Sequence, residues 1–293
     1  MISRRSFFTV AGMGLAAAAA PSFGEAKVRV PGQNKCPFRL GMAGFTMHKR
    51  SLEETLKIMQ RVDLHYLCIK DFHLPLKSTK EECDAFHAKC AEYGVTGYAV
   101  GPIYMGSEND ARNAFEYAKR VGVKTVVGVP FEMRDFNGKN RRCSSRKLLE
   151  TVSQLCAEFD IRYAIHNHGP DMPELVPTAK VGYDMIGDLD KRVGLCIDIG
   201  HELRFDVDPV ESVRAYRDRI YDMHLKNVTD NSRKGGATPL PRGKIDLPEL
   251  VRALCEINYT GVCSLEYERD YTDNEVPVAE CVGYFRGLMD SVR

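Results

Sequence analysis

The sequence lacks several features that would mark other classes of protein. Its 41 basic and 40 acidic residues leave a formal net charge of only +1, without the basic excess typical of proteins that bind nucleic acid or anionic membranes. Its ten cysteines form no CxxC pair. Residues 40–45, LGMAGF, end the first predicted strand without the GxGxxG spacing of a dinucleotide-binding open sheet. No repeat, low-complexity segment or linker interrupts the chain after its N-terminus.

The N-terminus has the layout of a cleavable export signal. Residues 3–8, SRRSFF, precede an alanine-rich apolar run over residues 10–20. That run is short for a membrane span, which needs about 20 apolar residues. Because the paired arginines resemble the twin-arginine signal of bacteria, we predict an export signal over residues 1–26 and a periplasmic or otherwise exported domain over residues 27–293. Proteins exported this way fold before they cross, so we expect free thiols and no disulfide framework.

From residue 37 onward, short β-branched or aromatic runs alternate with amphipathic stretches. Eight strands are predicted at residues 38–43, 66–70, 95–100, 125–129, 162–167, 193–198, 220–225 and 262–267. Helices are predicted over residues 51–61, 78–93, 108–121, 144–159, 209–217, 247–257 and 276–289, with capping boxes at Ser51/Glu54 and Ser78/Glu81. Residues 173–190 suggest a loop with a short helix. Alternation predicts parallel pairing, and roughly 265 residues match the ~250 of one (β/α)8 TIM barrel.

Histidines and carboxylates gather where predicted strands end. The strand-end residues are His73, His166, His168, Asp198, His201, His224, Lys226, Glu266 and Glu268, which include five of the eight histidines. These ends open onto the active face of a barrel, and alternate residues of a strand share a face. Any one of these residues alone would more often be structural, but the set together predicts a site for Zn, Mn, Co or Fe. We expect Lys70 and Asp71 to be solvated loop charges, and His48, His65 and His87 to be structural.

Four segments carry a resemblance to a known family. They are residues 198–201 (DIGH), 224–227 (HLKN), 242–246 (RGKID) and 264–266 (SLE). They resemble the sugar phosphate isomerase/epimerase family of xylose isomerase-like barrels, a group that also includes DNA-repair enzymes of the endonuclease IV type. The resemblance implies a divalent metal ion held by a strand-five acid, Asp198, His224 and Glu266. Here His166 stands in place of that acid, so His166 is the fourth predicted ligand, and Asn227 replaces the aspartate that commonly follows the lysine.

The change at His166 affects the implied mechanism. Family epimerases use two metal-bound carboxylates, which face opposite sides of the substrate carbon, and His166 leaves one of them missing. We predict that Glu266 removes a proton α to a carbonyl, with His168, His201 and Lys226 as the other catalytic groups. Exported enzymes meet few phosphorylated sugars, so a non-phosphorylated keto-sugar is expected. Isomerase or epimerase chemistry and 3-keto-glycoside lyase or hydratase chemistry by β-elimination both stay open.

Two further classes are weighed against the enzyme. A nuclease of the endonuclease type would need more metal ligands and a basic face. A non-catalytic carbohydrate-binding barrel would bind sugar in the presence of a chelator, whereas the enzyme would need its divalent ion. The expected partner is therefore a small sugar or glycoside, with no nucleic acid, no membrane after signal cleavage, and a possible homo-oligomer.

Overall fold

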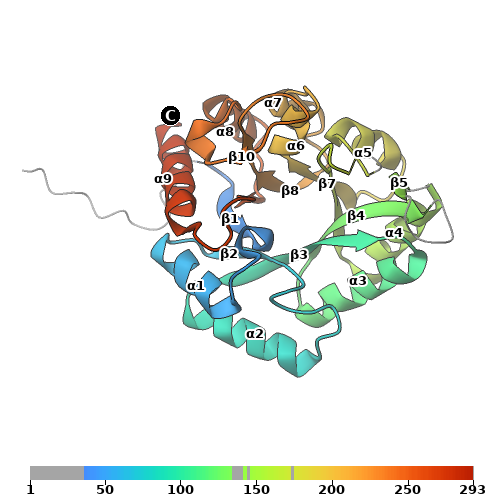
Figure 1. Ribbon diagram of the computed structural model, residues 1–293. Helices are drawn as coiled ribbons and strands as arrows, with labels where there is room; N and C mark the ends of the chain where they lie inside the picture. Colours follow the sequence, from blue (N-terminus) through green and yellow to red (C-terminus); the bar gives the residue numbers. More distant parts are fainter. Residues whose placement is uncertain (1–35, 134–140, 144–145, 173–174, 293) are drawn as a thin grey trace, which may run out of the picture. The chain divides into compact units, whose positions relative to one another are not determined.

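Eight parallel strands close into a barrel in the computed structural model, which describes residues 36–133, 141–143, 146–172 and 175–292 (Figure 1). They are β1 (Arg39–Ala43), β2 (Tyr66–Ile69), β3 (Thr96–Met105), β4 (Thr125–Met133), β6 (Arg162–His166), β7 (Val193–Asp198), β8 (Ile220–Leu225) and β11 (Val262–Leu265). Each strand pairs with the next one in this order, and β11 pairs with β1, so the ring has no free edge. The prediction of a (β/α)8 TIM barrel is confirmed.

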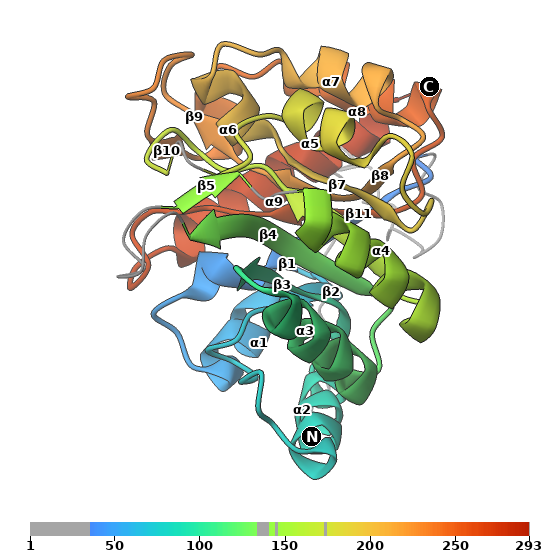
Figure 2. The ribbon, with the colours of Figure 1, turned by 90° about the vertical axis from the view of Figure 1, so that its right-hand side faces the viewer.

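Helices lie on the outside of the barrel (Figure 2). They are α1 (Leu52–Arg61), α2 (Lys80–Glu92), α3 (Glu108–Val121), α4 (Arg146–Phe159), α5 (Ala179–Ile186), α6 (Ile199–Arg204), α7 (Pro209–Ala215), α8 (Leu247–Glu256) and α9 (Glu275–Ser291), with 3-10 turns η1 (Gly44–Met47) and η2 (Leu240–Arg242). Helix α3 shows how local sequence sets the boundaries. The Ser107 hydroxyl accepts from the Asp110 amide at its start, and Gly122 ends it at φ 86°, a conformation that glycine adopts without a steric penalty.

One of the two predicted capping boxes is displaced by a residue. The Ser51/Glu54 box is present at the start of α1. The box at Ser78/Glu81 is wrong, because Thr79 and Glu82 form it instead. The Ser78 amide donates to the Pro75 carbonyl in the preceding turn, so Ser78 belongs to the loop. The next residue is then the first that can cap α2.

Some short elements were not predicted. Strand β5 (Arg141–Cys143) pairs antiparallel with β4, and β9 (Asn227–Val228) pairs with β10 (Ala237–Thr238). Two or three residues are too few to show a periodic pattern. Helix α6 begins directly after β7, where the Asp198 carboxylate accepts from the His201 amide. His201, the third residue of α6, has its Nε2 3.1 Å from Lys226 Nζ, directly after β8.

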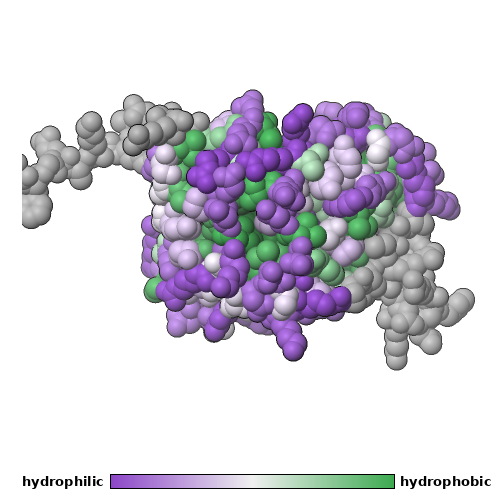
Figure 3. All heavy atoms as spheres, turned by 90° about the horizontal axis from the view of Figure 1, so that it is seen from above, coloured by the Kyte–Doolittle hydropathy of each residue, from purple (hydrophilic) through white to green (hydrophobic). Residues whose placement is uncertain are grey.

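The core has two parts. A large cluster of apolar side chains fills the space between strands and helices, and a small cluster of Cys68, Ala99, Val127, Ala164 and Cys196 lies apart from it. Each large apolar side chain buried in this way contributes roughly 1.5–3 kcal/mol relative to exposure. On the face shown in Figure 3, hydrophobic side chains are visible between hydrophilic ones near the middle of the view.

Nine of the ten cysteines are free thiols. Of the helices described, none is both long and apolar enough to cross a membrane. The predicted export signal over residues 1–26 lies outside the described residues and stays a prediction. The described part belongs to one compact unit over Asn34–Arg293.

Candidate metal centre

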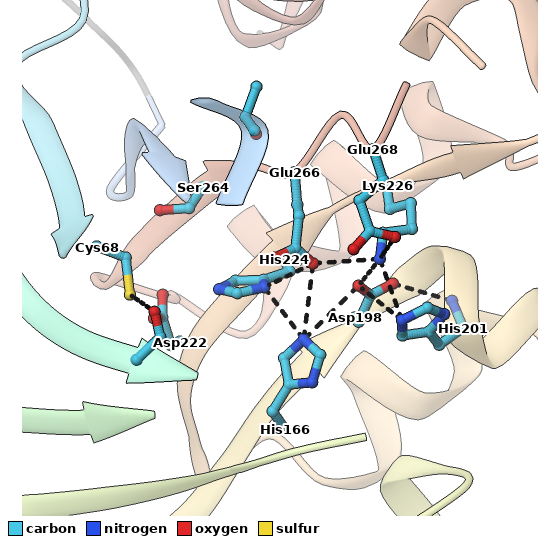
Figure 4. Close-up of polar contacts among 12 residues, drawn as sticks. Cys68, His166, Asp198, His201, Asp222, His224, Lys226, Ser264, Glu266 and Glu268 are labelled. Carbon is cyan, nitrogen blue, oxygen red and sulfur yellow. Dashed lines mark hydrogen bonds and ion pairs between the residues drawn. The ribbon is translucent and has the colours of Figure 1, made fainter. Parts of the chain in front are cut away.

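Four neighbouring strands bring two imidazoles and two carboxylates together at their C-terminal ends. His166 ends β6, Asp198 ends β7, His224 lies on β8, and Glu266 directly follows β11 (Figure 4). Asp198 and His224 are direct partners in the sheet register. All four residues are at most 3% exposed, and one ligand atom from each lies within 4.8 Å of the others. The structure thus places the four predicted metal ligands around one point.

The distances among these atoms fit a divalent cation. His166 Nε2 lies 3.1 Å from His224 Nδ1, and it lies 3.7 Å from both Asp198 Oδ2 and Glu266 Oε2. His224 Nδ1 lies 3.0 Å from Glu266 Oε2. Ligands about 2.0–2.2 Å from a tetrahedral ion are roughly 3.3–3.6 Å apart. Within the described part of the chain, Asp198 Oδ2 and Glu266 Oε2 are buried atoms that accept no hydrogen bond. The Lys226 ammonium lies 3.0 Å and 3.2 Å from these two buried oxygens, and a divalent cation would be a further positive partner for them.

Burial and neighbouring charges shift the pKa values of these four groups in different directions. Burial lowers the pKa of His166 to about 3 and raises that of Asp198 to about 7. Burial opposes ionisation of Glu266 as well, but the positive charges of His224 and Lys226 outweigh it and lower the pKa of Glu266 well below its usual range. The pKa of His224 is raised despite burial, in part by the Glu266 charge. His166 is therefore neutral at physiological pH, as a metal ligand must be.

The Lys226 ammonium forms ion pairs with three carboxylates of the site. Its Nζ lies 3.0 Å from Asp198 Oδ2, 3.2 Å from Glu266 Oε2 and 2.7 Å from Glu268 Oε2. It also lies 3.1 Å from His201 Nε2. Burial opposes its charge, but the three carboxylates raise the pKa of Lys226 well above its usual range. Lys226 is therefore a permanent cation beside the predicted metal ligands.

A glycine gives this lysine its room. A Cβ on Gly200 would lie 2.7 Å from Lys226 Cγ and 3.0 Å from the Lys226 carbonyl oxygen. Any larger residue at this first turn of α6 would displace Lys226. In the DIGH segment, Asp198 therefore provides a carboxylate, Gly200 lets the Lys226 side chain pack against the backbone, and His201 provides an imidazole.

The remaining predicted catalytic residues line the same region. The His168 and His201 rings stack with centroids 5.2 Å apart, and His168 Nε2 lies 2.8 Å from the Tyr104 hydroxyl. Burial lowers the pKa of His168 to about 4 and that of His201 well below its usual range. Both rings are therefore neutral at physiological pH. The contribution of Tyr104 was not predicted, because it lies at the far end of a strand that was expected to stop at residue 100.

A buried network holds the strand that carries Asp198. Asn167 Nδ2 donates to the Asp198 carbonyl and Asn167 Oδ1 accepts from the Asp198 amide. Glu202 in turn accepts from Asn167 Nδ2, the Ala179 amide and the Ser212 hydroxyl. This role of Glu202 was not predicted, because its partners Asn167 and Ala179 are distant along the chain.

The other strand-end candidates lie elsewhere or have other roles. His73 Nε2 faces the Arg50 carbonyl at 3.1 Å and takes no part in the cluster of four ligands. Lys70 was expected to be solvated, and this is wrong. It is 9% exposed, and its Nζ donates to the Pro102 carbonyl, because its strand ends inside the barrel mouth. His65 and His87 make hydrogen bonds to backbone carbonyls, consistent with structural roles.

Asn227, which departs from the family pattern, organises the loop after β8. Its Nδ2 donates to the Leu240 carbonyl, and its Oδ1 accepts from the Val228 and Ile245 amides. A Cβ on Gly243 would lie within 2.5 Å of this amide group, so the RGKID segment needs glycine there. An amide matches this surrounding because it both donates and accepts.

Fold and site together define a closed parallel barrel with an imidazole–carboxylate centre of the metal-binding type at its C-terminal end. The chain belongs to the xylose isomerase-like TIM barrel family, whose model matches residues 62–287. A curated relative, the inosose dehydratase of Clostridium botulinum strain Eklund 17B, is 29% identical over 138 residues, which are 42% of this chain and 45% of that protein. The match thus spans less than half of the relative's length.

Two solved structures share the fold. The IolI protein, crystallised with a bound zinc atom, has 19% sequence identity and a TM-score of 0.69 over 86% of this chain and 98% of that one. D-psicose 3-epimerase of Clostridium cellulolyticum H10, solved with D-tagatose, has 15% identity and a TM-score of 0.66 over 86% of this chain and all of the other. At these identities the similarity shows the fold alone.

Proposed function

We propose that the protein is a divalent-metal-dependent enzyme that removes a proton α to a carbonyl of a non-phosphorylated keto-sugar. One observation carries this proposal. His166, Asp198, His224 and Glu266 converge within 4.8 Å, with the Lys226 ammonium beside their two carboxylates. A cation and a fixed ammonium next to a carboxylate base are the groups that enolate formation needs. The inosose dehydratase relative supports a substrate of the sugar or cyclitol type.

The chain's own groups divide the work. A bound divalent ion would polarise the substrate carbonyl and stabilise negative charge on its oxygen. Glu266, held ionised by His224 and Lys226, takes up the proton from the α-carbon. Lys226 adds a fixed positive charge close to the developing oxyanion. His168, a neutral imidazole hydrogen-bonded to the Tyr104 hydroxyl, is the chain's second base and accepts a proton at a ring nitrogen.

The asymmetry of the centre also favours β-elimination as a second candidate. An epimerase needs bases on both faces of one carbon, and His166 provides no carboxylate on the β6 side. In an elimination, Glu266 takes the α-proton, the carbon–carbon double bond forms, and the β-carbon–oxygen bond breaks. The leaving oxygen then takes up the proton that Glu266 removed or one from the Lys226 ammonium, because His168 and His201 are neutral imidazoles. This corresponds to a 3-keto-glycoside lyase or a dehydratase.

Solvent exchange tests the proposal. The metal-free protein is loaded with Zn, Mn or Co and incubated in deuterated water with a panel of keto-sugars and 3-keto-glycosides. Deuterium at the α-carbon, measured by NMR and dependent on the metal, supports proton abstraction. Release of the β-substituent in the same sample distinguishes elimination from isomerisation. No exchange with any metal across the panel contradicts the proposal.

Variants connect the exchange to the site. We expect Glu266→Gln to abolish exchange and His168→Gln to slow it by about 100-fold or more. His65→Gln is the matched control. The hydrogen bonds of His65 are to the Asp63 carboxylate and the Gly94 carbonyl, neither of which belongs to the ligand cluster. Sugar binding that persists unchanged in chelator, without exchange, would instead indicate a carbohydrate-binding barrel.

A further inference from the structure

A second polar layer lies one step deeper in the barrel than the predicted ligands. Asp222 precedes His224 by two residues on β8, and Ser264 precedes Glu266 by two residues on β11. Alternate residues of a strand share a face, so both point into the barrel (Figure 4). Cys196 stands in the same relation to Asp198. Asp222, Ser264 and Cys196 are completely buried.

The third strand completes this layer. The Tyr98 hydroxyl lies 2.9 Å and 3.0 Å from the two Asp222 oxygens and 2.7 Å from Ser264 Oγ. The Met223 amide also donates to Asp222 Oδ1 at 2.9 Å. Tyr98 therefore donates to the carboxylate and accepts from the serine. A carboxylate at this depth costs several kcal/mol in desolvation, whereas a barrel interior is ordinarily filled with branched apolar residues.

His224 connects the two layers. Its Nδ1 faces His166 and Glu266, so its Nε2 points away from the predicted metal position. Nε2 is buried, and among the described residues it has no hydrogen-bond partner. Cys68, Asp222 and Cys196 lie near this histidine, since each belongs with His224 to a group whose ligand atoms lie within 4.8 Å of one another. Of these three side chains, the Asp222 carboxylate is the strongest acceptor.

We propose that Asp222 is a positioning residue for His224, held in place by Tyr98. A histidine that binds a metal ion through Nδ1 must carry its remaining proton on Nε2, and a carboxylate beneath that nitrogen stabilises this arrangement and strengthens the ligand. The charge of Asp222 also adds to the attraction for the cation above. The inference rests on the metal centre of the proposed function and not on its reaction, so metal affinity tests it independently of any substrate.

The test measures zinc affinity by competition with a chromophoric chelator. We expect Asp222→Asn to weaken zinc binding by about 10–100-fold, the usual effect of removing such an outer partner. Tyr98→Phe, which leaves the packing volume almost unchanged, should weaken binding by about threefold or more. Tyr163→Phe is the matched control. Tyr163 is fully buried, and in the described part of the chain its hydroxyl has no hydrogen-bond partner.

A double-mutant cycle separates positioning from general destabilisation. If Tyr98 acts through Asp222, then Tyr98→Phe has no further effect on zinc affinity in the Asp222→Asn background. Zinc affinity within twofold of the wild type in a folded Asp222→Asn protein would overturn the inference. The inference would also be overturned if Tyr98→Phe weakened zinc binding equally in the wild-type and Asp222→Asn backgrounds. If Asp222→Asn fails to fold, the zinc affinity of Tyr98→Phe is compared with that of Tyr163→Phe. Equal zinc affinities of these two variants would overturn the inference. A protein that binds zinc as described but shows no solvent exchange would contradict only the proposed reaction.

Discussion

His166 Nε2 lies 3.1 Å from His224 Nδ1 in the mouth of the barrel, with one oxygen each of Asp198 and Glu266 close to both. The family resemblance implies three carboxylates and one imidazole at this position. Here two imidazoles and two carboxylates are present. Imidazole suits borderline metals such as zinc, whereas carboxylates suit manganese and magnesium. His166 should therefore shift the metal preference of this centre toward zinc.

Restoring the carboxylate tests this preference. We expect His166→Glu to retain a divalent ion but to lower the zinc-over-manganese preference by about tenfold or more, because a hard oxygen replaces a nitrogen ligand. Competitive binding measured by metal analysis after equilibrium dialysis gives the ratio. We expect His166→Ala to lower zinc affinity by more than about 100-fold, because it removes a predicted ligand, whereas removing an outer partner costs at most roughly 100-fold. An unchanged ratio in His166→Glu would show that His166 does not face the ion.

Lys226 should oppose metal binding even though it assists catalysis. Its ammonium lies 3.0 Å from Asp198 Oδ2 and 3.2 Å from Glu266 Oε2, the same oxygens predicted to bind the ion. Two positive charges about 4 Å apart repel by about 4 kcal/mol at an effective dielectric constant of 20. We expect Lys226→Met to bind zinc at least about tenfold more tightly, and to lose most of its activity. Isothermal titration with zinc measures the affinity, and weaker binding would contradict this picture.

Glu202 should make stability depend on pH. Burial raises its pKa from 4.5 to about 7. The folded protein then holds this proton more tightly than the unfolded chain does, so stability is full below about pH 4.5 and falls as the pH rises toward about 7. Glutamine imitates the protonated acid, since its Oε1 can accept from the Ala179 amide and its Nε2 can donate to the Ser212 hydroxyl.

Urea unfolding in the presence of a chelator measures this effect. We expect Glu202→Gln to equal the wild type near pH 4.5 and to exceed it by up to about 3 kcal/mol at about pH 8. Glu108→Gln, a change at an exposed carboxylate on α3, is the control for loss of charge. Parallel pH profiles for Glu202→Gln and the wild type would contradict the prediction.

Asn227 should not tolerate the aspartate that the family pattern favours. Its Nδ2 donates to the Leu240 carbonyl at 2.8 Å inside a buried loop. An aspartate would place an oxygen against that carbonyl, and we expect Asn227→Asp to destabilise the protein by about 1–3 kcal/mol. Thermal unfolding measures the change. A stability equal to that of the wild type would show that the loop rearranges around the new charge.

The barrel was predictable because its signal is local and repeated. Each strand is a short apolar run, and each main helix has its own start signal and amphipathic period. The boundaries failed where two equivalent caps are adjacent, as at Ser78 and Thr79. They also failed where β3 runs on to Met105 through a glycine and a proline that suggested an end.

The convergence of His166, Asp198, His224 and Glu266 was predictable because the ends of parallel strands meet at one face. The groups that support them were missed for a physical reason. Asp222, Tyr98 and Glu202 act through contacts between residues far apart in the chain, such as Tyr98 with Asp222. A polar residue within a strand carries no sign of which neighbour it faces. Only the closed barrel shows that these residues lie directly behind or beneath the ligands.

The most direct test of the metal centre is a crystal structure of the zinc-loaded protein with anomalous data recorded on both sides of the zinc absorption edge. The account predicts one strong anomalous peak at about 2.0–2.2 Å from His166 Nε2, Asp198 Oδ2, His224 Nδ1 and Glu266 Oε2. A protein that takes up no zinc, or a peak that leaves His166 and His224 unligated, would contradict it.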